Sequence, residues 1–238
     1  MYIDGPSTYL REPNFSKEGG FVKDFLVEEP GGSDILIVDD LNVSVTNPNA
    51  RPLAYDNNYD DWFLNSEVLS GDDEIDVDRL RGNIYMHGYR GADELTGGYG
   101  DDMIKGGNGA DVLTGNDGAD ILYGGFGHNS FTGERDGQVD SLFFKSDQFA
   151  YNWIYESASN SPNGEKVDVI KALDANDQVF VQGVTTSELS FGSLSNFSTA
   201  TENFSGVGIY ANGFLEAIYA GGDLNASQLQ AMTSGVPI

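Results

Sequence analysis

The chain has 238 residues, of which 38 are acidic and 12 are basic, so its formal net charge at pH 7 is −26. This charge repels nucleic acids and anionic membranes, and it makes cations the natural partners. With 39% hydrophobic and 12% aromatic residues, the chain is too apolar for a disordered acidic tail. It has no cysteine, which excludes disulfides, thiolate metal sites and a thiol nucleophile. It also lacks a cleavable signal sequence and an apolar window that could span a bilayer, so we expect no direct membrane insertion.

Residues 1–69 are the least regular part, and we interpret them as an N-terminal β or irregular segment that could act as an assembly arm. The apolar run "GGFVKDFLVEE" (19–29) has no obvious partner. The stretch "GGSDILIV" (31–38) is either a stray turn of the repeat described below or an ordinary strand, and the strand is favoured.

The stretch "DNNYDDWFLNSE" (56–67) partly fits an EF-hand calcium loop. Asp56, Asn58, Asp60 and Glu67 occupy ligand positions of such a loop, but Asp61 stands where a glycine is required. A plain acidic loop is therefore favoured over a calcium site.

Residues 88–132 form five consecutive nine-residue blocks, of which "GGNGADVLT" (106–114) is typical. Within each block an acidic or amide residue is followed two positions later by an apolar residue. Upstream, Met86 fits the same frame with Ile84 in the aspartate position, and "SGDDEIDVD" (70–78), which contains Asp73, fits after a two-residue slip. The repeated pairs are Asp93 and Leu95, Asp102 and Ile104, Asp111 and Leu113, Asp120 and Leu122, and Asn129 and Phe131.

Each block divides into a six-residue loop and a three-residue extended piece whose central apolar residue points inward. Glycines suit the loop because it needs positive φ angles. If two blocks make one turn of a coil, Asp93 stacks on Asp111 and Asp102 on Asp120, with strands about 4.8 Å apart. Two carboxylates at that spacing repel each other by about 1 kcal/mol in water and by more in a less polar setting. Calcium between them would reverse the sign, with loop carbonyls completing its shell, whereas magnesium fits less well.

The blocks resemble the GGxGxDxUx nonapeptide of the RTX (repeats-in-toxin) family of secreted proteins. This resemblance implies an all-β fold built on a right-handed parallel β-roll, type I export through an uncleaved C-terminal signal, and folding on Ca²⁺ after export. Two departures imply weaker sites at the end of the repeat: Asn129 offers only a neutral oxygen, and Asn116 replaces a glycine. The implied ligands are the side chains of Asp73, Asp93, Asp102, Asp111, Asp120 and Asn129, and the carbonyls of Gly91, Gly98, Gly100, Gly107, Gly109 and Gly118.

The remaining chain reads as a C-terminal antiparallel β cap, with a hairpin turn at Asn212-Gly213 and a short helix within 225–235 that begins after Asn225 and ends before Gly235. The segment "DVIKALDANDQVFVQG" (168–183) resembles the one that follows RTX rolls and closes them. The secretion signal would lie at this end. We therefore divide the chain into residues 1–69, a roll over 70–137 and a cap over 138–238.

No motif for a zinc protease, a lipase or a phosphate loop is present, and His87 and His128 are expected to point outward, so we predict no enzymatic activity. The favoured function is a secreted bacterial calcium-binding protein that acts as a structural or surface module. Its partners would be calcium and, in addition, copies of itself or a cell-surface polysaccharide, but not nucleic acid. A chain starting at methionine favours a self-contained protein, and the alternative is an accessory domain of a larger exported enzyme, toxin or adhesin.

Overall fold

The computed structural model describes residues 2–4, 14–18, 21–28, 34–39, 43–44, 71–76, 78, 83–133, 135–147, 167–198 and 203–237. These residues form two sheets, one α-helix and one short 3-10 helix. The strands are β1 (Tyr2–Asp4), β2 (Asn14–Glu18), β3 (Phe21–Glu28), β4 (Asp34–Asp39), β5 (Val43–Ser44), β6 (Glu74–Asp76), β7 (Asn83–Arg90), β8 (Glu94–Thr96), β9 (Met103–Asn108), β10 (Val112–Thr114), β11 (Ile121–Phe126), β12 (Ser130–Thr132), β13 (Ser141–Lys145), β14 (Asp168–Ala172), β15 (Gln178–Gln182), β16 (Leu189–Ser198), β17 (Asn203–Ala211), β18 (Phe214–Tyr219) and β19 (Thr233–Val236). The helices are η2 (Thr186–Glu188) and α1 (Ala226–Met232).

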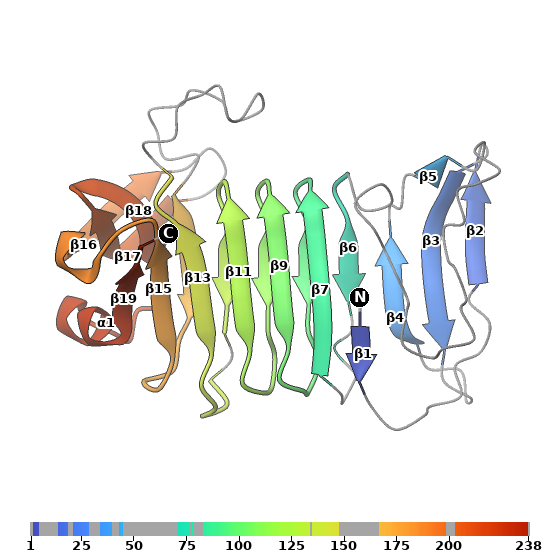
Figure 1. Ribbon diagram of the computed structural model, residues 1–238, viewed down its shortest axis with the longest axis horizontal. Helices are drawn as coiled ribbons and strands as arrows, with labels where there is room; N and C mark the ends of the chain where they lie inside the picture. Colours follow the sequence, from blue (N-terminus) through green and yellow to red (C-terminus); the bar gives the residue numbers. More distant parts are fainter. Residues whose placement is uncertain are drawn as a thin grey trace.

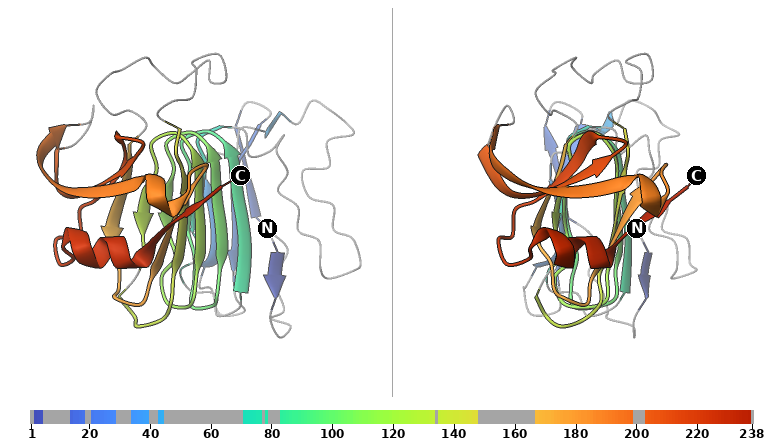
Figure 2. Two further views of the ribbon diagram at one scale, coloured as in Figure 1. Left: turned by 60° about the vertical axis from the view of Figure 1, so that its left-hand side comes forward. Right: turned by 90° about the vertical axis from the view of Figure 1, so that its left-hand side faces the viewer.

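From β6 to β15, successive strands alternate between the two sheets, which makes a flattened coil with two strands in each turn (Figure 1). The seven-stranded sheet has the order β1-β7-β9-β11-β13-β15-β19. The twelve-stranded sheet has the order β16-β17-β18-β14-β12-β10-β8-β6-β4-β3-β2, and β5 pairs with β3. Seen end-on in the right-hand view of Figure 2, the coil is a narrow loop with one layer of strands on each side. The predicted all-β parallel roll is confirmed.

The register of the roll follows the nine-residue repeat. Leu113 is the Cα partner of both Leu95 and Phe131, eighteen residues away on either side, so each block stacks on the block two positions further on, as predicted. Ile75 pairs with Leu95 at an offset of twenty residues, which is the predicted two-residue slip. The inward residues form the core between the sheets, and six of them are fully buried: Met86, Leu95, Ile104, Leu113, Leu122 and Phe131.

Parallel pairing continues beyond the nonapeptide repeats. The strands β13, β15 and β19 extend one sheet, and β14 and β18 extend the other, all in parallel. Antiparallel pairing in the predicted cap is confined to β16, β17 and β18. The sequence did not reveal this because alternating apolar residues, as in "SLFFK" of β13, fit a strand of either direction. The division of the chain at residues 69, 137 and 138 stays a prediction.

The N-terminal strands pair with the first strands of both sheets. The strand β1 lies antiparallel to β7, and β4 lies antiparallel to β6. The expectation that residues 19–29 lack a partner is wrong, because β3 pairs with β2, β4 and β5. The stretch 31–38 contains β4, whose antiparallel pairing makes it an ordinary strand and not a turn of the roll.

The C-terminal region matches its predicted turn and helix. Asn212 and Gly213 both have positive φ, of 51° and 87°, and connect β17 to β18 as a hairpin. Asn225 caps α1 by accepting hydrogen bonds from the backbone N–H groups of Ser227 and Gln228. Gly235, expected simply to follow the helix, belongs to β19, which the sequence did not predict.

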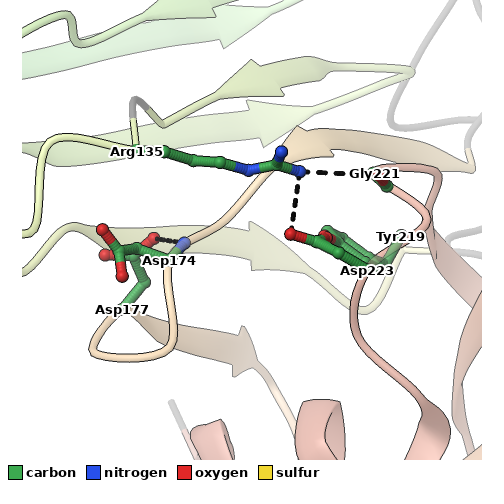
Figure 3. Close-up of polar contacts among 6 residues, drawn as sticks. All are labelled: Arg135, Asp174, Asp177, Tyr219, Gly221 and Asp223. Carbon is green, nitrogen blue, oxygen red and sulfur yellow. Dashed lines mark hydrogen bonds and ion pairs between the residues drawn. The ribbon is translucent and has the colours of Figure 1, made fainter.

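An ion pair connects this region to the loop between β12 and β13. The Arg135 guanidinium lies 3.0 Å from an Asp223 carboxylate oxygen and donates a hydrogen bond to the Gly221 carbonyl (Figure 3). The Tyr219 hydroxyl donates to the same carboxylate. Since Arg135 and Asp223 are each about half exposed, we expect the pair to contribute at most about 1 kcal/mol.

Candidate calcium sites

Two columns of buried acidic or amide side chains run along the roll, one at the start of the strands of each sheet. Each member is at most 3% exposed. The column of the twelve-stranded sheet contains Asp73, Asp93, Asp111, Asn129 and Asp168, and that of the seven-stranded sheet contains Asp102, Asp120, Asp140 and Asp177.

Hydrogen bonds link each column from turn to turn. The Oδ1 atom of Asp111 accepts the backbone N–H of Asp93 at 3.1 Å, and Oδ1 of Asp93 accepts that of Asp73 at 3.0 Å. In the other column, Oδ1 of Asp120 accepts the N–H of Asp102 at 2.8 Å. Each carboxylate beyond Asp73 therefore uses one oxygen to hold the preceding turn in register.

The second carboxylate oxygen is left for another partner. The Oδ2 atoms of Asp93, Asp111, Asp120 and Asp140 are buried and have no hydrogen-bond partner among the described residues, whereas Oδ2 of Asp102 accepts the Gly98 N–H at 2.8 Å. A buried, unpaired carboxylate oxygen is costly unless a cation neutralises it. These oxygens are hard ligands of the kind that calcium prefers.

The first glycine of each block makes room for the carboxylate. A Cβ atom added at Gly106 would lie 2.2 Å from Oδ2 of Asp111, and one added at Gly115 would lie 2.2 Å from Oδ2 of Asp120. The φ angle of Gly106 is not positive, so positive φ explains only some of the loop glycines, such as Gly107 at 122° and Gly109 at 151°.

Loop carbonyls lie between stacked turns of the roll. A Cβ atom added at Gly109 would lie 1.6 Å from the carbonyl oxygen of Gly91, and one added at Gly118 would lie 2.3 Å from that of Gly100. The carbonyl oxygens of Gly107 and Gly109 approach Gly125 and Gly127 in the same way. The arrangement thus places neutral oxygens between turns, as a calcium shell requires. The ligand roles of the individual residues stay predictions.

The two departures from the repeat retain its geometry. Asn116 has a positive φ of 67°, and its side-chain amide donates a hydrogen bond to the Gly97 carbonyl at 2.7 Å. Asn129 keeps its place in the column, since its Oδ1 accepts the Asp111 N–H at 3.2 Å. Its Nδ2 atom faces Gly124 as the carboxylate oxygens face their own glycines, so one potential ligand is replaced by a hydrogen-bond donor.

Burial raises the pKa of the column carboxyls above the usual value for aspartate. The pKa rises to about 6 for Asp93 and Asp102, to about 7 for Asp111 and Asp140, and to about 8 for Asp120. Desolvation is the main cause, and neighbouring carboxylates add to it, while hydrogen bonds from backbone N–H groups oppose it. Without a cation, Asp111, Asp120 and Asp140 therefore stay partly protonated at neutral pH.

Sequence reasoning missed three column members. Asp168 and Asp177 lie in the segment that resembles the end of RTX rolls, and Asp140 precedes an apolar residue, Leu142, at the spacing of the repeat. Insertions concealed their register, because Asp140 follows Asp120 by 20 residues and Asp177 follows Asp140 by 37. Oδ2 of Asp177 accepts the N–H of Asp174 at 2.6 Å (Figure 3).

In the described part of the chain, no three histidine or carboxylate side chains converge as a metal cluster. His87 and His128 are partly exposed. The EF-hand-like stretch 56–67 lies outside the described residues. The described helix α1 has seven residues, and none in this part of the chain is long and apolar enough to cross a membrane.

Comparison with known families agrees with this geometry. Two overlapping stretches, residues 85–113 and 96–131, match the model of the RTX calcium-binding nonapeptide repeat (4 copies). No curated protein and no solved structure matches the chain significantly. The RTX repeat binds Ca²⁺, is structural and not itself catalytic, and is typical of secreted bacterial proteins. Residues 85–131 of the chain therefore carry RTX calcium-binding repeats.

Proposed function

We propose that this RTX protein acts outside the bacterial cell as a structural module of a surface or matrix, and that its roll folds when it meets calcium after export through an uncleaved C-terminal signal. One observation carries the proposal: buried carboxylate oxygens without a partner recur along both columns, as in Asp93 and Asp120. Without calcium, ionisation of these buried carboxyls destabilises the fold through desolvation and mutual repulsion, whereas bound calcium would turn the same oxygens into ligands. Such a chain stays unfolded until calcium is abundant.

Circular dichroism and small-angle scattering of the full chain, in chelator and in millimolar calcium, test this folding switch. We expect a gain of β signal together with compaction in calcium, and a much weaker response to magnesium. Identical spectra and dimensions in chelator and calcium would rule out the proposal.

We further propose that the calcium-loaded chain can assemble into a layer or fibre. Each sheet of the described chain ends in edge strands, β1 and β19 in one and β2 and β16 in the other. Edge strands present backbone groups that pair with further strands, and a head-to-tail contact propagates without closing. Calcium also cancels part of the net charge of −26 that keeps the chains apart.

Light scattering after calcium addition tests assembly, comparing the full chain with one that lacks residues 1–29. We expect calcium-dependent growth of the full chain and less growth of the truncated one, which lacks the strands β1, β2 and β3. A full-length chain that folds in calcium but stays monomeric at high concentration would refute assembly and leave the folding switch intact.

A further inference from the structure

A groove of about 830 Å³ crosses the outer face of the seven-stranded sheet. Its lining includes Arg90, Lys105, Lys145 and the partly buried His87. Among the described residues that line it, none is acidic, although the chain has 38 acidic residues. The groove is therefore a cationic surface on an otherwise strongly acidic protein.

The groove results from the alternation of side chains on β7, β9, β11 and β13, which lie side by side in Figure 1. On β9, Ile104 points into the core and Lys105 points outward. Lys105 is the Cα partner of both His87 on β7 and Tyr123 on β11. These outward residues take no part in the carboxylate columns, so calcium binding does not account for them.

Aromatic rings hold the two lysines in place. The Lys105 Nζ atom lies 5.1 Å from the ring centre of Tyr85 and 5.5 Å from that of Tyr123, and the Lys145 Nζ atom lies 3.4 Å from that of Phe126. Such contacts keep an ammonium group ordered without neutralising it. Both ammonium groups thus stay at the groove, and that of Lys145 also interacts with the Asp147 carboxylate.

We propose that this groove binds an acidic polysaccharide, a chain of sugar units that carry carboxylate or sulfate groups. The lysines and Arg90 would bind the anionic groups, the amides of Asn108 and Gln182 would hydrogen-bond hydroxyl groups, and the ring edges would contact the apolar faces of the sugars. The groove volume of about 830 Å³ lies within the range of volumes that small-molecule binding sites have. This inference goes beyond the proposed function, because it assigns a ligand to a face without calcium ligands.

Other chain-like ligands fit this face less well. A peptide strand adds to a sheet edge, whereas the backbone groups beneath the groove are already paired within the sheet. A nucleic acid carries one charge per about 3.4 Å of each strand. The lysines of β9 and β13 lie two strands apart, which corresponds to about 10 Å, so they suit a polymer with sparser charges.

The test measures binding of a glucuronic acid hexamer to the calcium-loaded full chain by isothermal titration calorimetry. A neutral glucose hexamer and poly-L-glutamate serve as comparison ligands. The double variant Lys105→Gln and Lys145→Gln removes both charges, and Lys171→Gln, an exposed lysine of β14 in the other sheet, is the matched control. Circular dichroism in calcium verifies that each variant folds.

We expect the acidic hexamer to bind more tightly than either comparison ligand. The double variant should weaken its binding about tenfold, and Lys171→Gln should change it less than twofold. Equal binding of poly-L-glutamate would show a general anion surface and overturn the proposal. Equal binding of the glucose hexamer, no binding of the acidic hexamer by the folded chain, or an unchanged affinity of the folded double variant would overturn it as well.

Discussion

Asp111 interacts with the turns on both sides of its own. Its Oδ1 holds the turn that contains Asp93, its own N–H is held by Asn129, and its Oδ2 is buried without a hydrogen-bond partner. Its position in the middle of a column places it beside two gaps between turns. Loss of its carboxylate therefore affects ligand sets on both sides, whereas loss of the neutral Asn129 side chain removes a weaker ligand.

We therefore predict that Asp111→Ala raises the calcium midpoint of folding about tenfold, which corresponds to about 1.4 kcal/mol. Asn129→Ala should raise it less. Parallel calcium titrations followed by circular dichroism measure both midpoints. If the two variants have equal midpoints, the carboxylate of Asp111 has no special role between adjacent turns.

Gly106 provides a second test at the scale of single residues, because the Asp111 carboxylate occupies the space that a side chain at position 106 would need. Gly106→Ala should destabilise the calcium-loaded chain by about 1–3 kcal/mol through overpacking. Gly71→Ala is the matched control, since a Cβ atom there would have nothing within 4 Å. Urea unfolding in calcium measures the stability of both variants. An equal loss of stability in the two variants would show that the contact with Asp111 does not cause the destabilisation.

At the scale of elements, the sequence predicted the strand pairing of the nine-residue repeat better than that of the regions around it. The nine-residue period gave the stacking of alternate blocks, the inward row from Met86 to Phe131, and the two-residue slip that places Asp73 beneath Asp93. These followed because each block repeats the same local geometry. The same period indicated the columns, although only the structure shows that one oxygen of each carboxylate holds a backbone N–H and leaves the other for a cation.

The partners of non-repetitive strands could not be predicted in the same way. Residues 19–29 and 233–236 have no periodic neighbour in the sequence, and β19 pairs with β15, more than fifty residues away. Apolar alternation shows that a segment is a strand but not its direction or its partner. The sequence also could not show why position 106 is a glycine. A glycine required by a neighbouring side chain and one required by a positive φ look alike in a sequence.

The continuation of the columns beyond the nonapeptides leads to a prediction for β13. Asp140 lies between Asp120 and Asp177 in its column, and its buried Oδ2 has no hydrogen-bond partner. We expect Asp140→Asn to raise the calcium midpoint severalfold, although the residue lies outside the repeats that match the family. Asp117→Asn, in an exposed loop, should leave it nearly unchanged. If Asp140→Asn and Asp117→Asn have equal calcium midpoints, calcium binding ends with the nonapeptide repeats.

At the scale of the whole molecule, protons and calcium compete for the same columns. In the unfolded chain an aspartate has a pKa of about 3.9. In the calcium-free fold, burial raises the pKa to about 7 for Asp111 and about 8 for Asp120. Between about pH 4 and pH 8 the fold therefore binds more protons than the unfolded chain, so its stability without calcium decreases as the pH rises through this window.

Calcium reverses this dependence, because only the ionised carboxylates bind it. In chelator, we predict that the β signal declines from pH 5 to pH 8. In calcium, the chain should be fully folded at pH 8, and the calcium midpoint should increase as the pH falls. Circular dichroism at a series of pH values, with and without chelator, measures both trends. A calcium-free chain that gains β structure between pH 5 and pH 8 would contradict the raised pKa values, and with them the argument that calcium neutralises the columns.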